Sequence, residues 1–245
     1  MLSTIYNAIL YRPIFNVLVF LYNIVPGHDF GIAIILLTIL ILAVLYPLSY
    51  KLIKSRQALT VIQPKIKEIQ NKYKNKEEQA REMMKAYKEH NINPVSGCLP
   101  LLIQLPILIA LYRVLLNVLK PGSLSVLYPF IENPGTINSL FFGVLNLAKA
   151  SPILAGLAGL SQFLYSKLMM KYSPPTPQPS QQKGAMDIQK MIGKQTTYIF
   201  PFMIVIFGLS VPAGLTLYWI AFSLLSMGRD YYLFKKLYGK NKKDS

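Results

Sequence analysis

Long runs without a charged residue limit the folds open to this chain more than any other feature. The run Phe30–Tyr50 carries no charged side chain, and Gly97–Leu119 carries only Arg113. A helix of about 20 mostly apolar residues is long enough to cross the hydrocarbon core of a bilayer. Charged residues make up only 15% of the sequence, against about 25% in ordinary globular domains. The sequence therefore predicts an all-α integral membrane protein.

Three further apolar runs bring the predicted number of spans to five. Pro152–Met170 is short, and Thr197–Val211 and Ala213–Met227 flank a Pro-Ala-Gly turn. The chain is expected to comprise an external interfacial helix (1–28), a first span (29–50), a cytoplasmic helical hairpin (51–95), a second span (96–119), an external loop (120–150), a third span (151–171), a cytoplasmic Pro/Ser/Gln linker (172–196), the fourth and fifth spans (197–233) and a basic cytoplasmic tail (234–245).

Positive charge is distributed very unevenly between the connecting segments. Residues 51–95, 167–196 and 229–245 carry 22 of the 26 Lys and Arg residues. The segments on the opposite side carry only Arg12, Lys120 and Lys149. Because cytoplasmic loops carry an excess of Lys and Arg, the three rich segments are predicted to be cytoplasmic. Five spans then place the N-terminus outside the cell membrane and the C-terminus inside.

Residues 1–28 contain an apolar stretch that we do not count as a span. Only twelve residues lie between Pro13 and Pro26, and they include Asn16 and Asn23. Such a stretch is too short to cross a bilayer, whereas an amphipathic helix lying on the outer surface fits it. If the stretch did span, the chain would have six spans, and the charges would no longer separate by side.

Residues 51–93 predict two antiparallel helices. Apolar residues recur there at three- and four-residue steps around a polar turn at 74–76, and Pro64 is expected to open the first arm rather than kink it. A simple connector needs only a few residues, so this length favours a docking role over a solvated link. The residues expected to dock are Lys65, Lys67, Lys72, Arg81, Lys85 and Lys88 on the hairpin, and Lys236 and Lys242 on the tail. For the tail, anionic lipid is the simpler contact and ribosomal RNA the alternative.

No group of residues points to catalysis, a metal or a cofactor. The single cysteine, Cys98, begins an apolar run, and His28 and His90 lie in turn-like polar contexts. The five apolar runs contain no Asp, Glu or His that could relay protons. The sequence thus argues against an enzyme, an ATPase and a proton-coupled transporter, and we expect no bound cofactor and no metal.

Four polar side chains in the predicted spans lie at comparable depth in the inner half of the membrane. At about 1.5 Å of rise per residue, Gln104, Gln162 and Ser223 lie about 9–12 Å from the cytoplasmic ends of their helices, with Thr38 somewhat deeper. If they face one another, they line a wet concavity open to the cytoplasm; unrelated hydrogen bonds between helices would give the same spacing. The run 197–211 rises only about 22 Å, against about 30 Å of hydrocarbon, and would thin the bilayer. A wet groove beside a thinned membrane is what an insertase needs.

A series of motifs follows in order between about residues 30 and 235. They are Leu45-Tyr46-Pro47-Leu48, Gln63-Pro64-Lys65-Ile66, Glu82-Met83-Met84-Lys85-Ala86-Tyr87-Lys88, Asn93-Pro94-Val95-Ser96-Gly97-Cys98-Leu99-Pro100-Leu101-Leu102-Ile103-Gln104, and the run from Phe200-Pro201 to Pro212-Ala213-Gly214-Leu215-Thr216-Leu217-Tyr218-Trp219. In this order and spacing they resemble the YidC-type membrane protein insertases of the YidC/Oxa/Alb family. No large extracytoplasmic domain follows the predicted first span, and in this the chain resembles the compact bacterial form of the family.

The resemblance implies a five-helix core with a hydrophilic groove open to the cytoplasm, a cytoplasmic hairpin and an external amphipathic helix in a bacterial inner membrane. It implies a chaperone-like insertase that takes nascent membrane proteins from ribosomes and the signal-recognition machinery, alone or with the Sec translocon. Thr38 and Trp219 fall where the family has groove or substrate-facing residues. Together with Leu42, Gln104, Gln162 and Ser223 they form the expected groove.

Leu42 departs from the family pattern, which usually has an arginine at this position of the groove. Arg113 lies about 24 Å from the inner end of its span, compared with about 12 Å for Leu42, and is expected to snorkel to the outer interface. Two other functions therefore stay open: a ribosome-docking membrane scaffold with weakened insertase activity and, less favoured, a channel or solute transporter.

Overall fold

The computed structural model describes residues 2–90, 99–120, 122–172 and 195–241. Predictions that fall elsewhere, including Lys242 and most of the linker 172–196, lie outside the described residues. The chain forms two compact units. The first unit comprises 1–45, 101–165 and 201–226, and the second comprises 46–100, 166–200 and 227–245.

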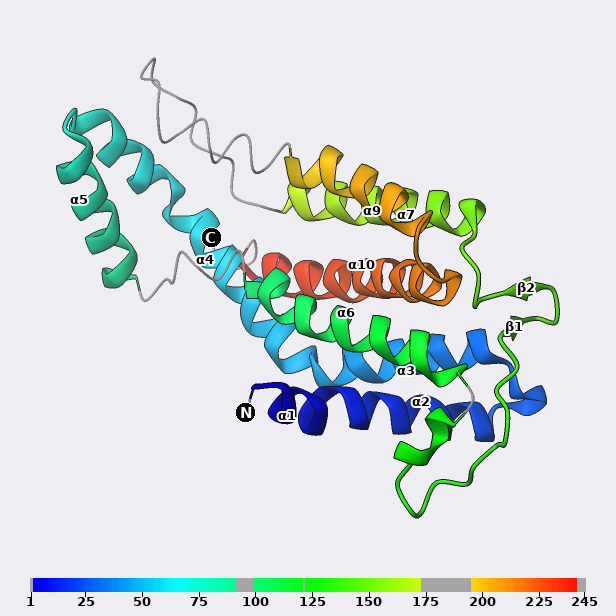
Figure 1. Cartoon of the computed structure of the whole chain (residues 1–245). Coiled ribbons are helices and arrows are strands. Elements are labelled where there is room, and N and C mark those ends of the chain that lie inside the picture. The colour runs from blue at the N-terminus through cyan, green and yellow to red at the C-terminus, as the bar shows by residue number, and fades with distance from the viewer. Residues whose placement is uncertain (1, 91–98, 121, 173–194, 242–245) are drawn as a thin grey trace. The chain divides into compact units, whose positions relative to one another are not determined.

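The first unit is a bundle of helices. They are α1 (Leu2–Tyr6), η1 (Asn7–Tyr11), α2 (Arg12–Ile24), η2 (Pro26–His28), α3 (Phe30–Val44), the greater part of α6 (Leu99–Val118) and of α7 (Pro152–Lys171), α9 (Phe200–Gly208), and the first half of α10 (Ala213–Asn241). Figure 1 shows these helices lying side by side. The predicted all-α fold is thus confirmed in its coarse form.

Apolar side chains from most of these helices meet in one core. Phe15 and Leu18 of α2, Leu37 of α3 and Tyr218 of α10 are among its most buried members. Other large apolar side chains face outward; Val44, on α3, is 69% exposed. An apolar helix that exposes one face and buries the other suits a protein whose surroundings are lipid.

Pro13 does not interrupt the N-terminal helix. Helical structure runs from Leu2 to Ile24 and continues through Pro13. Proline lacks an N–H and its ring crowds the carbonyl four residues earlier. The segment Asn7–Tyr11 just before it is wound as a π-helix, which widens the backbone there and lets the helix continue. The assumption that Pro13 confines the helix to twelve residues was therefore wrong.

By length and composition, two described helices can cross a membrane. They are Thr4–Ile24 and Pro152–Lys171, and a third is added if Phe30–Val44 and Tyr46–Lys72 count as one span. Ile103–Val118 and Thr197–Gly208 are shorter apolar helices. The count of five spans, and the interfacial position of residues 1–28, stay predictions.

The loop between α6 and α7 is ordered by side chains of the N-terminal helix. Asn16 is buried; its Oδ1 accepts a hydrogen bond from the backbone N–H of Tyr128 at 2.6 Å, and its Nδ2 donates to the carbonyl of Val126 at 3.3 Å. Further along α2, Asn23 Nδ2 donates to the carbonyl of Glu132 at 2.7 Å. The loop, which includes η4 (Ser123–Val126), therefore runs along α2.

A two-stranded hairpin in the same loop lies on the start of α3. Its strands are β1 (Leu140–Phe141) and β2 (Leu145–Asn146), antiparallel, with Phe141 opposite Leu145. Asp29 caps α3, because its Oδ1 accepts from the N–H of Ile32 at 2.9 Å. A Cβ on Gly31 would collide with the ring of Phe141, so glycine allows the hairpin to approach the helix closely.

In the second unit, α4 (Tyr46–Lys72) and α5 (Lys76–Glu89) form the predicted helical hairpin. Ile62, Ile66 and Ala86 are its buried centre, and Asn75 caps α5 by accepting a hydrogen bond from the N–H of Glu77. Pro64 lies inside α4, not at its start. Packing of the apolar stripe on α5 holds the helix together across a residue that costs an isolated helix about 3 kcal/mol.

The C-terminal half of α10 belongs to the second unit as well. Leu233 and Phe234 are fully buried, and Phe234 stacks on Tyr172 with ring centroids 4.4 Å apart. Gln57 Nε2, on α4, donates to the carbonyl of Leu237 at 3.0 Å. The first part of the predicted tail, 234–241, is therefore helical and attached to α4. A short π-helical turn, η5 (Gln195–Ile199), precedes α9.

Candidate functional site

A glutamine on α7 joins two polar side chains of α10 inside the first unit. Gln162 Oε1 accepts hydrogen bonds from Trp219 Nε1 at 3.0 Å and from Ser223 Oγ at 3.1 Å. Gln162 and Ser223 are buried, and Trp219 is half-buried. Trp219 and Ser223 are four residues apart and thus lie on one face of α10. The structure brings together three of the predicted groove residues, which we call the Gln162 junction.

A second polar contact joins α6 to the same helix. Gln104 Nε2 donates to the hydroxyl of Tyr218 at 2.8 Å. Tyr218 is fully buried in the core of the bundle. Sequence reasoning missed Tyr218, because an aromatic residue within an apolar run gives no sign of a polar role. Its hydroxyl needs a partner once it is buried, and Gln104 provides it.

Thr38 and Leu42 lie one turn apart on α3 and are both buried. Thr38 Oγ1 donates to the carbonyl of Ile34 at 2.7 Å, so its hydroxyl is satisfied within its own helix. Leu42 is 7% exposed and belongs to the apolar surface of α3. These two residues do not take part in the hydrogen bonds of the Gln162 junction.

Arg113, the one cation of the predicted second span, is turned toward the N-terminal helix. Its guanidinium lies 5.5 Å from the centre of the Tyr6 ring, within the range of a cation–π contact. One turn later, Asn117 Nδ2 donates to the hydroxyl of Tyr11 at 3.2 Å. In this arrangement Arg113 is engaged with α1 rather than with Leu42.

Small residues allow α9 to pack closely on α7. A Cβ on Gly159 of α7 would collide with the side chain of Val205. On α9, a Cβ on Gly208 would lie 2.9 Å from the Cβ of Ala155. Close helix approach through small residues is the usual way in which helices pack in membranes. The short apolar helix α9 is therefore held closely beside α7, the helix that carries Gln162.

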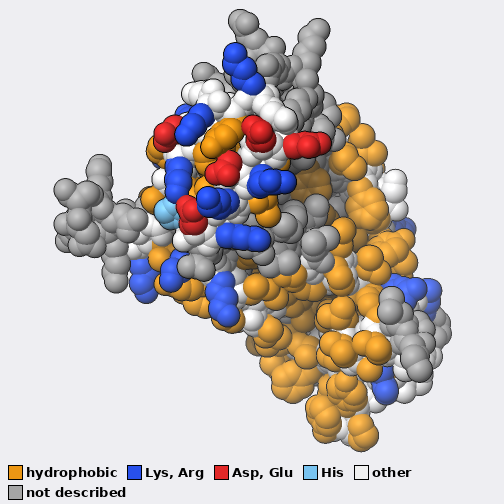
Figure 2. Space-filling model, turned by 90° about the vertical axis from the view of Figure 1, so that its left-hand side faces the viewer, with side chains coloured by type: hydrophobic (Ala, Val, Ile, Leu, Met, Phe, Trp, Pro, Cys, Tyr) orange, Lys and Arg blue, Asp and Glu red, His pale blue; other side chains and the backbone are white. Residues whose placement is uncertain are grey.

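The residues predicted to dock partners are exposed on the second unit. They are Lys65, Lys67, Lys72, Arg81, Lys85, Lys88 and Lys236. Figure 2 shows that carboxylates are interspersed with the basic side chains on the surface of the hairpin. Lys65 Nζ lies 2.9 Å from Glu89 Oε2, and this hydrogen-bonded Lys65 ammonium lowers the pKa of Glu89. The hairpin thus presents mixed charge with a basic excess.

Comparison with known proteins identifies the family. A family model described as 60Kd inner membrane protein matches residues 20–241. The chain belongs to this family. It is 35% identical to a membrane protein insertase YidC of Fusobacterium nucleatum over 230 residues, covering 93% of this chain and 98% of the relative. It is 36% identical over 208 residues to a YidC of Clostridium perfringens, covering 84% of this chain and 79% of the relative.

A solved structure agrees with the family assignment. It is described as an active YidC insertase with its first transmembrane domain resolved, and it matches with a TM-score of 0.59 and 26% identity over 93% of this chain and 46% of that one. The chain likewise spans only 52% of a YidC from Streptomyces avermitilis, to which it is 32% identical over 85% of its own residues. YidC proteins are membrane insertases rather than enzymes, and the chain is a membrane protein of this family.

In residues 2–90, 99–120, 122–172 and 195–241, no group of three or more His, Cys, Asp and Glu is placed to hold a metal ion. The polar groups of the Gln162 junction are neutral, and amide and hydroxyl groups of this kind bind by hydrogen bonding rather than by reaction.

Proposed function

We propose that this chain is a membrane protein insertase and chaperone that moves hydrophobic segments of nascent membrane proteins into the bilayer. The observation that carries the proposal is the Gln162 junction, a set of uncharged hydrogen-bonding groups inside an apolar bundle. A client chain that leaves water brings backbone and polar side chains which need partners. Gln162, Trp219 and Ser223 offer uncharged donors and acceptors. Such groups can bind the polar groups of a client for a short time.

Opening this junction requires little energy. A hydrogen bond between helices in a membrane contributes about 0.6 kcal/mol on average and at most about 2 kcal/mol. Water or a client can therefore replace the partners in the bonds to Gln162 and in the bond from Gln104 to Tyr218. The free energy lost in breaking these bonds is small enough for contacts with the client to offset it. We infer that Thr38, Gln104, Gln162, Trp219 and Ser223 line a groove open to the cytoplasm when a client is present.

The short helix α9 supports the same function. The apolar segment Thr197–Gly208, which combines the end of η5 with α9, rises only about 17 Å at 1.5 Å per residue, well short of about 30 Å of hydrocarbon. Such a mismatch thins the adjacent bilayer. Because α9 packs on α7, the thinned region lies next to the helix of Gln162. Client segments would cross less hydrocarbon at this place.

The second unit and the tail are assigned to partner docking. We place the hairpin α4–α5 and the basic tail in the cytoplasm, with the N-terminus outside, because 22 of 26 Lys and Arg residues then lie inside. The exposed bases of the hairpin would receive the ribosome and the signal-recognition machinery, and the tail would meet anionic lipid or ribosomal RNA. Cooperation with the Sec translocon belongs to the same proposal.

The N-terminal helix is assigned to the outer membrane surface. Its length would allow it to span, but Asn16 and Asn23 hold the loop 122–138 along it. That loop exposes Glu132 and Asn133, and polar loop backbone does not lie in hydrocarbon facing lipid. The part of α2 that carries the loop therefore lies at the interface.

Site-specific photocrosslinking tests the groove. A photoreactive residue replaces Trp219, and a control replaces Ile153, which is 75% exposed on the outside of the bundle. We expect a stalled nascent membrane protein to crosslink from position 219 and not from 153. Equal crosslinking from both positions, or none from 219, would remove the groove from the proposal. Depletion of the protein should at the same time block insertion of a small membrane protein with short tails.

Leu42 favours a second candidate, a docking scaffold with weakened insertase activity. Leu42 offers no charge at a position where the resemblance to the family implies that an arginine is usual. The change Leu42→Arg distinguishes the two functions. In a groove that water enters, the arginine is hydrated and insertion of a client with an acidic tail increases. In a scaffold whose α3 face stays dry, the buried charge lowers stability and insertion does not increase.

A further inference from the structure

The turn of the β1–β2 hairpin carries large apolar side chains that face away from the protein. Phe142 is 71% exposed and Val144 is 87% exposed, and Gly143 lies between them. Ile153, in the first turn of α7, is 75% exposed. Neighbouring large apolar side chains that are exposed to this extent seldom face water without a partner. The hairpin turn therefore requires an explanation beyond the packing of the bundle.

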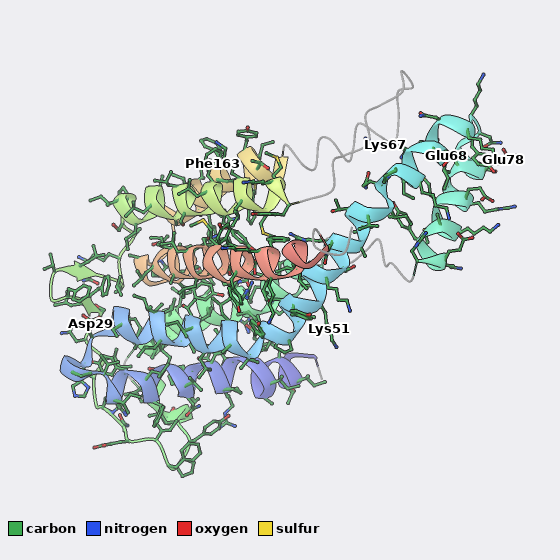
Figure 3. The ribbon with its side chains drawn as sticks, turned by 180° about the vertical axis from the view of Figure 1, so that it is seen from behind. Asp29, Lys51, Lys67, Glu68, Glu78 and Phe163 are labelled. Atoms are coloured by element: carbon green, nitrogen blue, oxygen red, sulfur yellow. The ribbon has the colours of Figure 1, made fainter. Side chains whose placement is uncertain are left out.

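The exposed conformation of Phe142 is held in place by the fold. Its φ is +50°, in the left-handed region that a residue other than glycine rarely adopts. The N–H of Phe142 donates to Asp29 Oδ2 at 2.5 Å, while the other oxygen of Asp29 caps α3. Figure 3 shows Asp29 beside the two strands. A strained residue persists only where its surroundings fix it, and here Asp29 does so.

The same loop is bonded to the start of α10. The N–H of Gly214 donates to the carbonyl of Leu147 at 3.0 Å, and the N–H of Ala213 donates to the carbonyl of Lys149 at 2.9 Å. The hairpin is thus fixed to the first turns of both α3 and α10. A contact that fixes the position of the hairpin turn would therefore also fix the positions at which α3 and α10 begin.

We propose that the turn Phe142-Gly143-Val144 inserts into the headgroup–acyl boundary of the bilayer, on the side where α3 begins, and anchors α3 and α10 at a fixed depth. The sequence predicts that the apolar lengths of these helices lie in hydrocarbon, which places the hairpin attached to their ends at its edge. The turn carries no charge, and both its large side chains are apolar. Apolar side chains at such a boundary bury about 5–10 Å deep. The inference does not depend on insertase activity.

Depth-dependent fluorescence quenching tests the anchor. In the full chain with Cys98→Ala, Val144→Cys is labelled with an environment-sensitive fluorophore, and the protein is reconstituted into phosphatidylcholine–phosphatidylglycerol vesicles. The matched control is Thr136→Cys, an exposed residue of the same loop. We expect blue-shifted emission at 144, quenched by nitroxides on the lipid acyl chains and protected from aqueous iodide. At 136 we expect emission typical of water and strong quenching by iodide.

Two outcomes would overturn the proposal. One is equal iodide quenching at both positions, which would show that the turn stays in water. The other concerns the coupling to α3. Asp29→Asn keeps one oxygen to cap α3 and removes the second acceptor, so the label at 144 should become more accessible to iodide while the protein stays folded. An unchanged label would show that Asp29 does not fix the anchor.

Discussion

Gln162 joins two helices of the bundle, α7 and α10, by polar contacts. Its side-chain oxygen accepts from both Trp219 and Ser223. We predict that Gln162→Leu leaves these donors without that acceptor and lowers the free energy of unfolding by about 1–3 kcal/mol, the usual cost of an unsatisfied buried group. Thermal unfolding in detergent, followed by circular dichroism, measures the loss. Insertion should fall as well.

Gln162→Glu serves as the control for this prediction. A glutamate, protonated or not, still presents an oxygen to Trp219 and Ser223, and its size is unchanged. It should therefore retain more stability than the leucine variant. If the leucine variant were as stable as the unaltered protein, the junction would contribute nothing to the fold, and its role would have to lie in client contact alone.

At the scale of elements, the contact between α7 and α9 depends on where glycine lies. We predict that Gly159→Leu separates the two helices, because a Cβ there already collides with Val205, and destabilises the protein by about 1–3 kcal/mol, as overpacking does. Gly156→Leu, one turn away on the same helix, should be tolerated, because a Cβ at this position meets no atom within 4 Å. Thermal unfolding of the two variants gives the comparison. Equal losses of stability in the two variants would contradict the close contact of α9 with Gly159.

The hairpin α4–α5 has a pH dependence that follows from the Lys65–Glu89 pair. Lys65 lowers the pKa of Glu89, so the pair stabilises the hairpin above the ordinary glutamate pKa of about 4.3 and loses this effect as pH falls through the lower folded value. Because both side chains are half exposed, the effect on stability is small. A carboxyl-carbon NMR titration should show Glu89 below the usual glutamate range. In Lys65→Met its pKa should rise toward that range, and an unchanged value would exclude the pair.

At the scale of the whole molecule, the charge distribution predicts sidedness. Trypsin added to inside-out membrane vesicles should cleave within 51–90, whereas trypsin added to right-side-out vesicles should leave this segment intact. Lys149, which we place on the opposite side, provides an internal control, because cleavage after it should show the reverse dependence. Cleavage of the hairpin from the outside would reverse the proposed orientation.

Much of the architecture could be predicted from local patterns, whereas the contacts between distant segments could not. Periodicity predicted the two helices of the hairpin, and depth along the spans brought Gln162 and Ser223 to the same level. Neither pattern could show that Tyr218 would contact Gln104, since Gln104 lies on another helix. The tie from Asp29 to Phe142 is equally non-local. Pro13 and Pro64 misled because proline opposes a helix locally, while a π-turn before Pro13 and packing around Pro64 let each helix continue.

The bonds from Ala213 and Gly214 to the loop before α7 also bear on how this chain enters the membrane itself. The first N–H groups of a helix have no partner within it and cannot leave water unpaired without a cost. The loop that accepts them is synthesised earlier than α10. On the proposed topology, we expect α10 to complete its first turn only after this loop has reached the outer side of the bilayer and packed onto α3. The hydrogen bonds between this loop and α10 would thus set the order in which the protein's own segments assemble in the membrane.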